Sequence, residues 1–110
     1  MFKILSLNTR GLGNAKKRKS VFRWIVSQKS NIIFLQETHS TIDDEITWSN
    51  DLTGHFIFSH GSKASRGAAI NLRNIDYNIH CVKTDSMGRV VIVSIDIEGK
   101  QYYNKFIRPK

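Results

Sequence analysis

The sequence has 110 residues, the size of one domain, with 40% hydrophobic and 24% charged residues. This composition excludes a disordered tail, and no apolar run approaches the ~18 residues that a membrane span needs. The single cysteine, Cys81, excludes an internal disulfide and favours a reducing compartment. We therefore expect an intracellular protein without a membrane partner, with the nucleus among the compartments open to it.

Positive charge is concentrated at the start of the chain. The formal net charge is +8, from 17 Lys and Arg against 9 Asp and Glu, and every acid lies at Glu37 or later. The cations before Glu37 account for the whole excess; they are Lys3, Arg10, Lys16, Lys17, Arg18, Lys19, Arg23 and Lys29. A surface that faces phosphate groups has this charge distribution, and a solvated basic helix is the alternative.

The first third of the chain predicts a strand, a turn and an amphipathic helix. The apolar pattern of residues 2–7 suits a strand that is buried on both faces. The glycine-containing turn at 11–14 ends with Asn14, a residue type favoured at helix N-caps. Residues 16–28 then carry apolar side chains at helical spacing, which indicates a helix with one face on a core.

A run of further strands follows. The continuous apolar segment 32–35 is typical of a central strand with both faces covered, and residues 43–52 predict a short helix. The later strands are expected at 55–59, 67–72, 90–98 and 101–107, the last two joined by a hairpin turn. Strand, helix, strand and then more strands predict an α/β fold.

Two polar side chains come at the ends of predicted strands. Glu37 directly follows the buried segment and Asn8 ends the first strand, so both are expected at the edge of the sheet where ligands bind in open α/β folds. If the two strands are neighbours, Asn8 lies beside Glu37. Mg²⁺ takes oxygen ligands and needs only one or two protein carboxylates when it also contacts substrate phosphate. An exposed surface glutamate and an asparagine turn cap are the alternatives that these residues leave open.

Three segments together resemble a known family. Residues 6–12 read SLNTRGL, residues 34–39 read FLQETH and residues 66–70 read RGAAI. Their order and spacing resemble the endonuclease/exonuclease/phosphatase superfamily, and the form is closest to the apurinic-type endonuclease domain of non-long-terminal-repeat (non-LTR) retrotransposons. The segment 85–89, DSMGR, also resembles that branch. The resemblance covers nearly the whole chain.

The resemblance implies that residues 1–110 are the N-terminal portion of a single domain, truncated at the C-terminus. The implied fold is part of a four-layer α/β sandwich, with a mixed, largely antiparallel sheet and helices on one face. The implied cofactor is Mg²⁺ or Mn²⁺, with Glu37 as metal ligand and Asn8 as its partner, both counted as catalytic. The implied substrate is DNA. Together with the basic start of the chain, this points to four substrate-binding residues: Arg10, Lys16, Lys17 and Arg66.

The histidines are weaker candidates for a catalytic or metal-binding role. His39 could act as a general base because histidine titrates near neutral pH, but in the family that histidine comes from the far C-terminal end of the domain. We therefore expect His39 to be a loop residue near the site. The other histidines, His55, His60 and His80, form no metal-type spacing.

The end of the chain departs from the family pattern. Residues 102–110 include the expected proline but no tyrosine at the matching place, and the family's later aspartate, asparagine and histidine segments are absent. The sequence therefore predicts a catalytically incomplete fragment of a magnesium-dependent DNA endonuclease, which leaves its status as an enzyme open. The alternatives are a non-catalytic nucleic-acid-binding module and a retroelement remnant without function. A phosphatase acting on a lipid or inositol phosphate is less favoured.

The truncation carries a structural expectation. In the family fold two sheets pack face to face, and the second sheet comes largely from the absent half. The inward face of this half, including Ile70, Val91, Val93 and Ile95, is then expected to be uncovered. Because a large apolar patch is a liability for a monomer, we expect self-association through this face.

Overall fold

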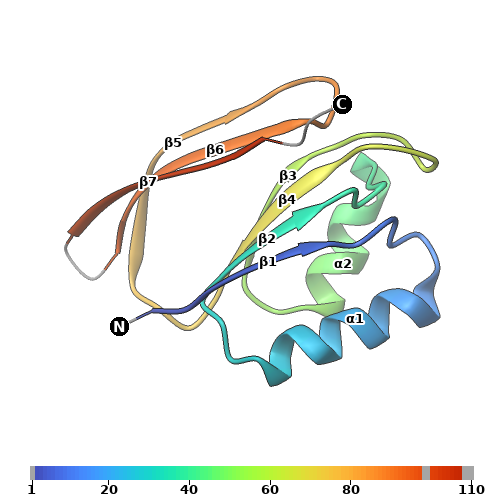
Figure 1. Cartoon of the computed structure of the whole chain (residues 1–110), viewed down its shortest axis with the longest axis horizontal. Helices are drawn as coiled ribbons and strands as arrows, with labels where there is room; N and C mark the ends of the chain where they lie inside the picture. The colour runs from blue at the N-terminus through green and yellow to red at the C-terminus, as the bar shows by residue number, and fades with distance from the viewer. Residues whose placement is uncertain (1, 98–99, 108–110) are drawn as a thin grey trace.

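Figure 1 shows the protein as a computed structural model that describes residues 2–97 and 100–107, with side chains described for residues 2–97. The elements in chain order are β1 (Ile4–Asn8), α1 (Ala15–Ser27), β2 (Ile32–Gln36), the 3-10 turn η1 (Ile42–Asp44), α2 (Glu45–Asp51), β3 (His55–Ser59), β4 (Ala68–Leu72), β5 (Tyr77–Thr84), β6 (Val90–Ile97) and β7 (Lys100–Ile107). They form two sheets, and both helices cover the outer face of the first sheet. The predicted α/β fold is confirmed. None of the described helices is long and apolar enough to cross a membrane.

The first sheet has the strand order β1-β2-β4-β3. β1 runs parallel to β2, whereas β4 runs antiparallel to both of its neighbours, so the sheet is mixed. β2 and β4 are buried along almost their whole length, which confirms that the continuous apolar run is a central strand. The prediction that the first strand is buried on both faces is wrong, because β1 lies at the edge of the sheet and Ile4 is 54% exposed.

The second sheet, with the strand order β5-β6-β7, packs on the inner face of the first. Val91, Val93, Ile95 and Ile97 alternate along β6 and are at most 1% exposed, in one cluster with β2, β3 and β4. Ile70 of β4 is equally buried in this cluster. The expectation of an uncovered inward face is therefore wrong, and the self-association expected through it loses its basis. The physical reason is that this half of the fold supplies its own second sheet.

The strand β5 was not predicted from the sequence, because its apolar alternation covers only Tyr77, Ile79 and Cys81 and is lost in the second half of the strand. Most of its side chains are exposed, and the pairing with β6 shifts register between Ile79 and Cys81. Such a bulge interrupts the two-residue period that identifies a strand. The predicted hairpin between β6 and β7 is present in the backbone pairing, while its turn at 98–99 and the proline at position 109 lie outside the described residues.

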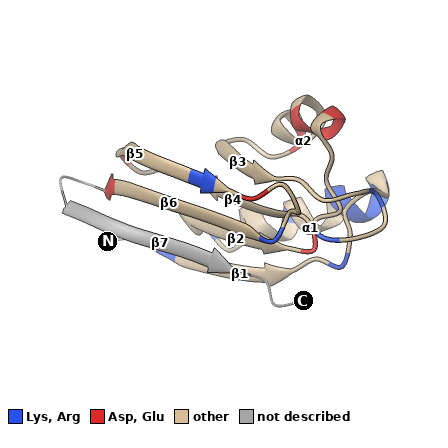
Figure 2. Ribbon diagram, turned by 90° about the horizontal axis from the view of Figure 1, so that it is seen from above, with Lys and Arg blue, Asp and Glu red and all other residues tan. Residues whose placement is uncertain are grey.

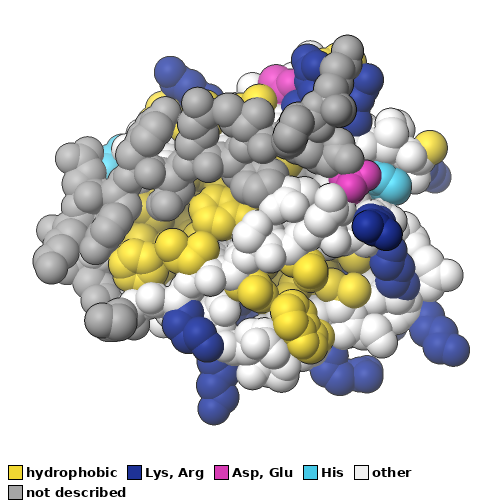
Figure 3. Space-filling model, viewed as in Figure 1, with side chains coloured by type: hydrophobic (Ala, Val, Ile, Leu, Met, Phe, Trp, Pro, Cys, Tyr) yellow, Lys and Arg dark blue, Asp and Glu magenta, His cyan; other side chains and the backbone are white. Residues whose placement is uncertain are grey.

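A second apolar cluster lies between the first sheet and the helices. Phe22 and Ile25 of α1 and Trp48 of α2 are at most 1% exposed and pack against the outer face of β2. The rings of Phe22 and Trp48 meet edge to face, 6.4 Å between centroids. The apolar stripe predicted for the first helix therefore faces this core. Some apolar side chains still reach the surface (Figure 3), among them Ile4 and Trp24.

Candidate active site at the carboxyl edge of β1 and β2

The two residues expected to meet at the edge of the sheet are neighbours. Asn8 pairs with Gln36 in the parallel ladder of β1 and β2, and Glu37 directly follows the last residue of β2. The antiparallel strands β4 and β3 bring Ala68 and Ser59 to the same edge. We call this edge, with the turns at 9–12, 37–40 and 66–67, the carboxyl edge. It is the position at which ligands bind in open α/β sheets.

The backbone at the carboxyl edge adopts an unusual conformation. Arg10, Glu37, His39 and Arg66 all have positive φ, between 49° and 65°. A left-handed residue other than glycine costs of order 1–3 kcal/mol and persists only where its surroundings hold it in place. Left-handed residues of this kind cluster at ligand sites. Four of them at one edge, each with a charged or titratable side chain, support a functional role for this edge.

Hydrogen bonds between the turns hold this conformation. The Gly11 N–H donates to the Glu37 carbonyl at 2.6 Å, and the Thr9 hydroxyl donates to the same carbonyl at 2.9 Å. On the other side, the Thr38 N–H donates to the Gly67 carbonyl at 3.0 Å and the His39 N–H to the Arg66 carbonyl at 2.7 Å. The turn that carries Glu37 is thereby fixed between the loops that follow β1 and precede β4.

Two glycines of the family-like segments are required by close packing. A Cβ atom at Gly11 would lie 2.5 Å from Nδ1 of His39, and one at Gly67 would meet the hydroxyl of Thr38. Both glycines also have positive φ, near 90°. The ring of His39 therefore packs against the backbone of Gly11, which agrees with its expected place in a loop near the site.

The segment 85–89, DSMGR, connects β3, the start of β6 and the turn before β4 through hydrogen bonds. The Asp85 carboxylate accepts the N–H groups of Arg89 and Val90 at 2.8 and 3.1 Å and the Ser59 hydroxyl at 3.2 Å. Burial by itself would raise the pKa of Asp85, but these hydrogen bonds outweigh it and hold the pKa below its usual value. The Gly67 N–H donates to the Gly88 carbonyl at 2.9 Å, which joins the segment to the turn before β4.

The side-chain oxygens of Glu37 and Asn8 are of the type that a hard cation such as Mg²⁺ takes as ligands. Glu37 is half-buried, and the Asn8 side-chain oxygen accepts the Arg10 N–H at 3.2 Å, as a turn cap does. An amide oxygen has a second lone pair that remains available for a ligand. Residues 2–97 contain no group of three His, Cys, Asp or Glu that could hold a metal ion by themselves. Glu37 and Asn8 therefore fit the small protein share of a Mg²⁺ site that also takes water and phosphate oxygens.

The cations predicted to bind substrate lie on the loops and helix end at this edge. The Lys17 ammonium group donates to the Arg10 carbonyl at 3.1 Å, and Lys16 is exposed in the first turn of α1. The predicted N-cap is present, because the Asn14 side chain accepts the Lys17 N–H at 2.9 Å. Arg66 lines a hollow of about 140 Å³ together with three serines of the adjoining loops.

The basic start of the chain does not form one surface. Arg18 is buried, with its guanidinium 3.1 Å from the Asp51 carboxylate and 5.7 Å from the centre of the Trp48 ring, so it joins the two helices and cannot face a phosphate. Lys3 lies at the opposite end of β1, where its ammonium group donates to the Gln28 carbonyl at 2.8 Å. Only part of the predicted basic surface is therefore placed at the carboxyl edge.

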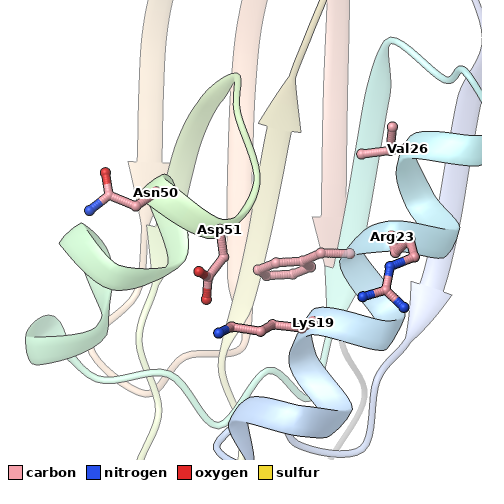
Figure 4. A pocket seen from close by; sticks show the side chains of 6 residues that line it. Lys19, Arg23, Val26, Asn50 and Asp51 are labelled. Atoms are coloured by element: carbon pink, nitrogen blue, oxygen red, sulfur yellow. The ribbon is translucent and has the colours of Figure 1, made fainter.

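Lys19 and Arg23 line a groove between the helices that the sequence did not indicate. The groove has a volume of about 330 Å³, and Asn50 and Asp51 of α2 form its far wall (Figure 4). Figure 2 shows the contrast in charge between the basic helix α1 and the acidic helix α2. Because Asp51 already contacts Arg18, the two cations of the groove have no acidic partner within residues 2–97.

His60, for which the sequence indicated no role, directly follows β3 and also lies at the carboxyl edge. Its ring contacts the side chains of Ser40 and Glu45. No sequence signal connects these residues. Ser40 is twenty and Glu45 fifteen positions before His60, and they meet His60 because β3 ends at the same edge as β2.

Comparison with solved structures identifies the fold. No family model matches the sequence. The chain is similar to the AP endonuclease LMAP from Leishmania major, with a TM-score of 0.72 and 18% identity over 97% of this chain and 40% of that one. It is also similar to D. rerio TDP2 humanized by 14 mutations, with a TM-score of 0.66 and 14% identity over 93% of this chain and 44% of that one.

A further D. rerio TDP2 structure, in complex with a single-strand DNA product, matches with a TM-score of 0.56 and 22% identity over 93% of this chain and 43% of that one. The chain thus spans less than half the length of each neighbour. At these identities the likeness shows the fold, and the retrotransposon branch stays a prediction. The fold of this chain is therefore the one shared with the AP endonuclease and TDP2 structures, in line with the fold that its three family-like segments implied.

Proposed function

We propose that this chain forms the N-terminal part of a magnesium-dependent endonuclease domain of the non-LTR retrotransposon type, which hydrolyses phosphodiesters of DNA. The observation that carries the proposal is the pairing of Asn8 with Gln36, which sets Glu37 and Asn8 side by side at the carboxyl edge. Glu37 and Asn8 would hold a Mg²⁺ or Mn²⁺ ion. When bound, the ion would supply positive charge that stabilises the phosphate during hydrolysis.

DNA is the partner that the charges at this edge favour. Arg10, Lys16, Lys17 and Arg66 are provided by the loop after β1, the first turn of α1 and the loop before β4. Cations around a strand-end site can bind phosphates on either side of the reacting one, independent of base sequence. Two of the structural neighbours support this partner by their descriptions, an AP endonuclease and a TDP2 bound to a DNA product.

A non-catalytic nucleic-acid-binding module is the second candidate. It is favoured by the position of His39, the candidate general base in the sequence, whose ring packs on the backbone of Gly11. General-base help is typically worth about 10²–10⁴-fold in rate. Magnesium-dependent nicking of supercoiled plasmid that is lost in Glu37→Ala would establish an enzyme, whereas DNA binding without nicking would favour the module. A retroelement remnant would show neither.

Titration of Mg²⁺ followed by NMR tests the metal site. We expect chemical shifts to move for residues at the carboxyl edge in the wild type and to stay still in Glu37→Gln, which removes the charge and keeps the size. Asp76→Asn is the matched control, because Asp76 is an exposed acid outside the carboxyl edge. Equal responses in the wild type and Glu37→Gln would refute Glu37 as the ligand.

A further inference from the structure

A chain of side-chain hydrogen bonds joins three elements behind the carboxyl edge. The Glu45 carboxylate lies 2.6 Å from Nε2 of His60, Nδ1 of the same ring lies 2.9 Å from the Ser40 hydroxyl, and that hydroxyl lies 3.0 Å from the Thr38 hydroxyl. We call these four residues the His60 relay. It runs from the first residue of α2, across the end of β3, to the turn that follows β2.

The relay is buried at the end that meets the turn. Thr38 and Ser40 are 0% exposed, and the His60 ring stacks on Phe58 with 4.9 Å between centroids. The order hydroxyl, imidazole, carboxylate is also that of a nucleophilic triad. A fully buried Ser40 hydroxyl cannot meet a substrate, so the arrangement acts on the protein's own backbone.

The two hydroxyls and the imidazole ring of the relay can all donate in the same direction, from Thr38 toward Glu45. The Ser40 N–H donates to the Thr38 hydroxyl oxygen, which leaves the Thr38 proton for the Ser40 oxygen and the Ser40 proton for Nδ1 of His60. The neutral ring then donates from Nε2 to Glu45. Every donor has an acceptor when His60 carries its proton on Nε2, and Glu45 favours that tautomer.

The relay ends one residue from Glu37. Thr38 directly follows Glu37, and the turn 37–40 contains two left-handed residues, Glu37 and His39. Backbone hydrogen bonds attach this turn to the loops beside it, and the Gly61 N–H, next to His60, also donates to the Ser40 carbonyl at 3.1 Å. The relay adds side-chain bonds to the buried inner side of the same turn.

We propose that His60 and Glu45 are positioning residues for Glu37: they hold the Thr38 and Ser40 hydroxyls and so keep the turn 37–40 in the conformation that presents Glu37 at the carboxyl edge. This rests on the proposed metal site. Groups that hydrogen-bond a metal ligand directly typically change metal affinity by about 10–100-fold when they are removed. His60 reaches Glu37 only through Ser40 and Thr38, so the effect belongs at the lower end of that range.

The first measurement is Mg²⁺ affinity by NMR titration. We expect His60→Ala to weaken binding by about tenfold, and His60→Gln, whose amide keeps one donor and one acceptor, to recover most of the loss. Glu45→Gln keeps an acceptor but loses the charge, and it should weaken binding less. His55→Ala is the matched control, since His55 lies at the other end of β3 and contacts Tyr77. Wild-type affinity in His60→Ala would overturn the proposal.

The second measurement separates this proposal from the metal site itself. Amide hydrogen exchange at Thr38 and His39 should be faster in His60→Ala than in the wild type, and unchanged in His55→Ala. Nitrogen shifts of His60 should show the Nε2–H tautomer. If the wild type binds no Mg²⁺, the proposed function fails, and faster exchange in His60→Ala alone would still establish that His60 holds the turn. Unchanged exchange would refute the positioning role. Should His60→Ala not fold, His60→Gln and Glu45→Gln carry both measurements.

Discussion

The two ends of the first sheet are built differently. At the end opposite the carboxyl edge, Asn31 joins the residues that flank three strands: its side-chain oxygen accepts the Lys3 N–H at 2.9 Å and its amide donates to the Arg73 carbonyl at 3.1 Å. The left-handed residues there have local explanations. Lys29 follows the C-cap of α1, where helices commonly end in this conformation, and asparagine, as at Asn74, tolerates it.

At the carboxyl edge the left-handed residues are Arg10, Glu37, His39 and Arg66, and of these only His39 is of a type enriched in that conformation. They are held by bonds between turns that are far apart in sequence. One end of the sheet is therefore built for stability, whereas the other keeps a backbone that is locally unfavourable. Proteins keep such strain where a site needs it.

The largest expected effect is on packing at the carboxyl edge. Gly67→Ala places a Cβ against the Thr38 hydroxyl and the His39 and Ser40 N–H groups at a left-handed position, so we expect a loss of more than about 1 kcal/mol in the free energy of unfolding. Gly13→Ala is the control, because no atom lies within 4 Å of the added Cβ, and it should change stability by less than about 0.5 kcal/mol. Urea unfolding measures both. Equal effects would mean that the turns are not tightly packed.

The second effect concerns the charges that distinguish the two ends. Replacing Lys16 and Lys17 by Gln should weaken DNA binding for all sequences alike and reduce the salt dependence, the slope of log K against log salt, by about two. The same change at Lys3 and Lys29, which lie toward the opposite end, should leave the slope unchanged. Fluorescence anisotropy over a range of salt concentrations measures the slopes. A loss that is the same for both pairs would remove the distinction between the ends.

A smaller effect would reveal the backbone strain itself. Arg10→Gly should raise the free energy of unfolding by about 0.5–1 kcal/mol, since glycine adopts φ near +52° without steric cost, while DNA binding weakens. Asn74→Gly at the opposite end should change stability by only a few tenths of a kcal/mol and leave binding intact. Thermal unfolding and binding measured on the same samples test this. If Arg10→Gly is less stable than the wild type, contacts of the Arg10 side chain stabilise this conformation, and the strain is not kept for the site.

The smallest effect is the pH dependence of the stability that the Asp85 hydrogen bonds contribute. Its pKa is lower in the folded protein than in the unfolded chain, so its contribution to stability is full above the unfolded value of about 3.9 and is lost as the pH falls through the folded value. The melting temperature of Asp85→Asn should therefore be below that of the wild type at neutral pH, and the gap should close below about pH 4. A gap that persists in acid would mean that the carboxylate charge is not what holds the turn.

Most of the local elements, and the place of Glu37 at the end of a buried strand, follow from the residues alone. Continuous apolar runs identified the central strand, alternation identified β6, and a polar residue directly after a buried strand placed Glu37 at the edge. These features depend on the period of burial along one segment, which the residues of that segment carry. The family-like glycines were also visible, although their reason, contact with His39 and Thr38, was not.

The features that join distant segments became visible in the folded chain. It showed that β5 and β6 cover the inner face of the first sheet, that Arg18 is buried against Asp51, and that His60 reaches Ser40 and Glu45. A charge run in sequence does not distinguish a cation that faces solvent from one that joins two helices, because both occur on the same amphipathic helix. The bulge in β5 likewise removes the period by which a strand is recognised. Partners across strands are set by register and packing, and the sequence of one segment does not contain them.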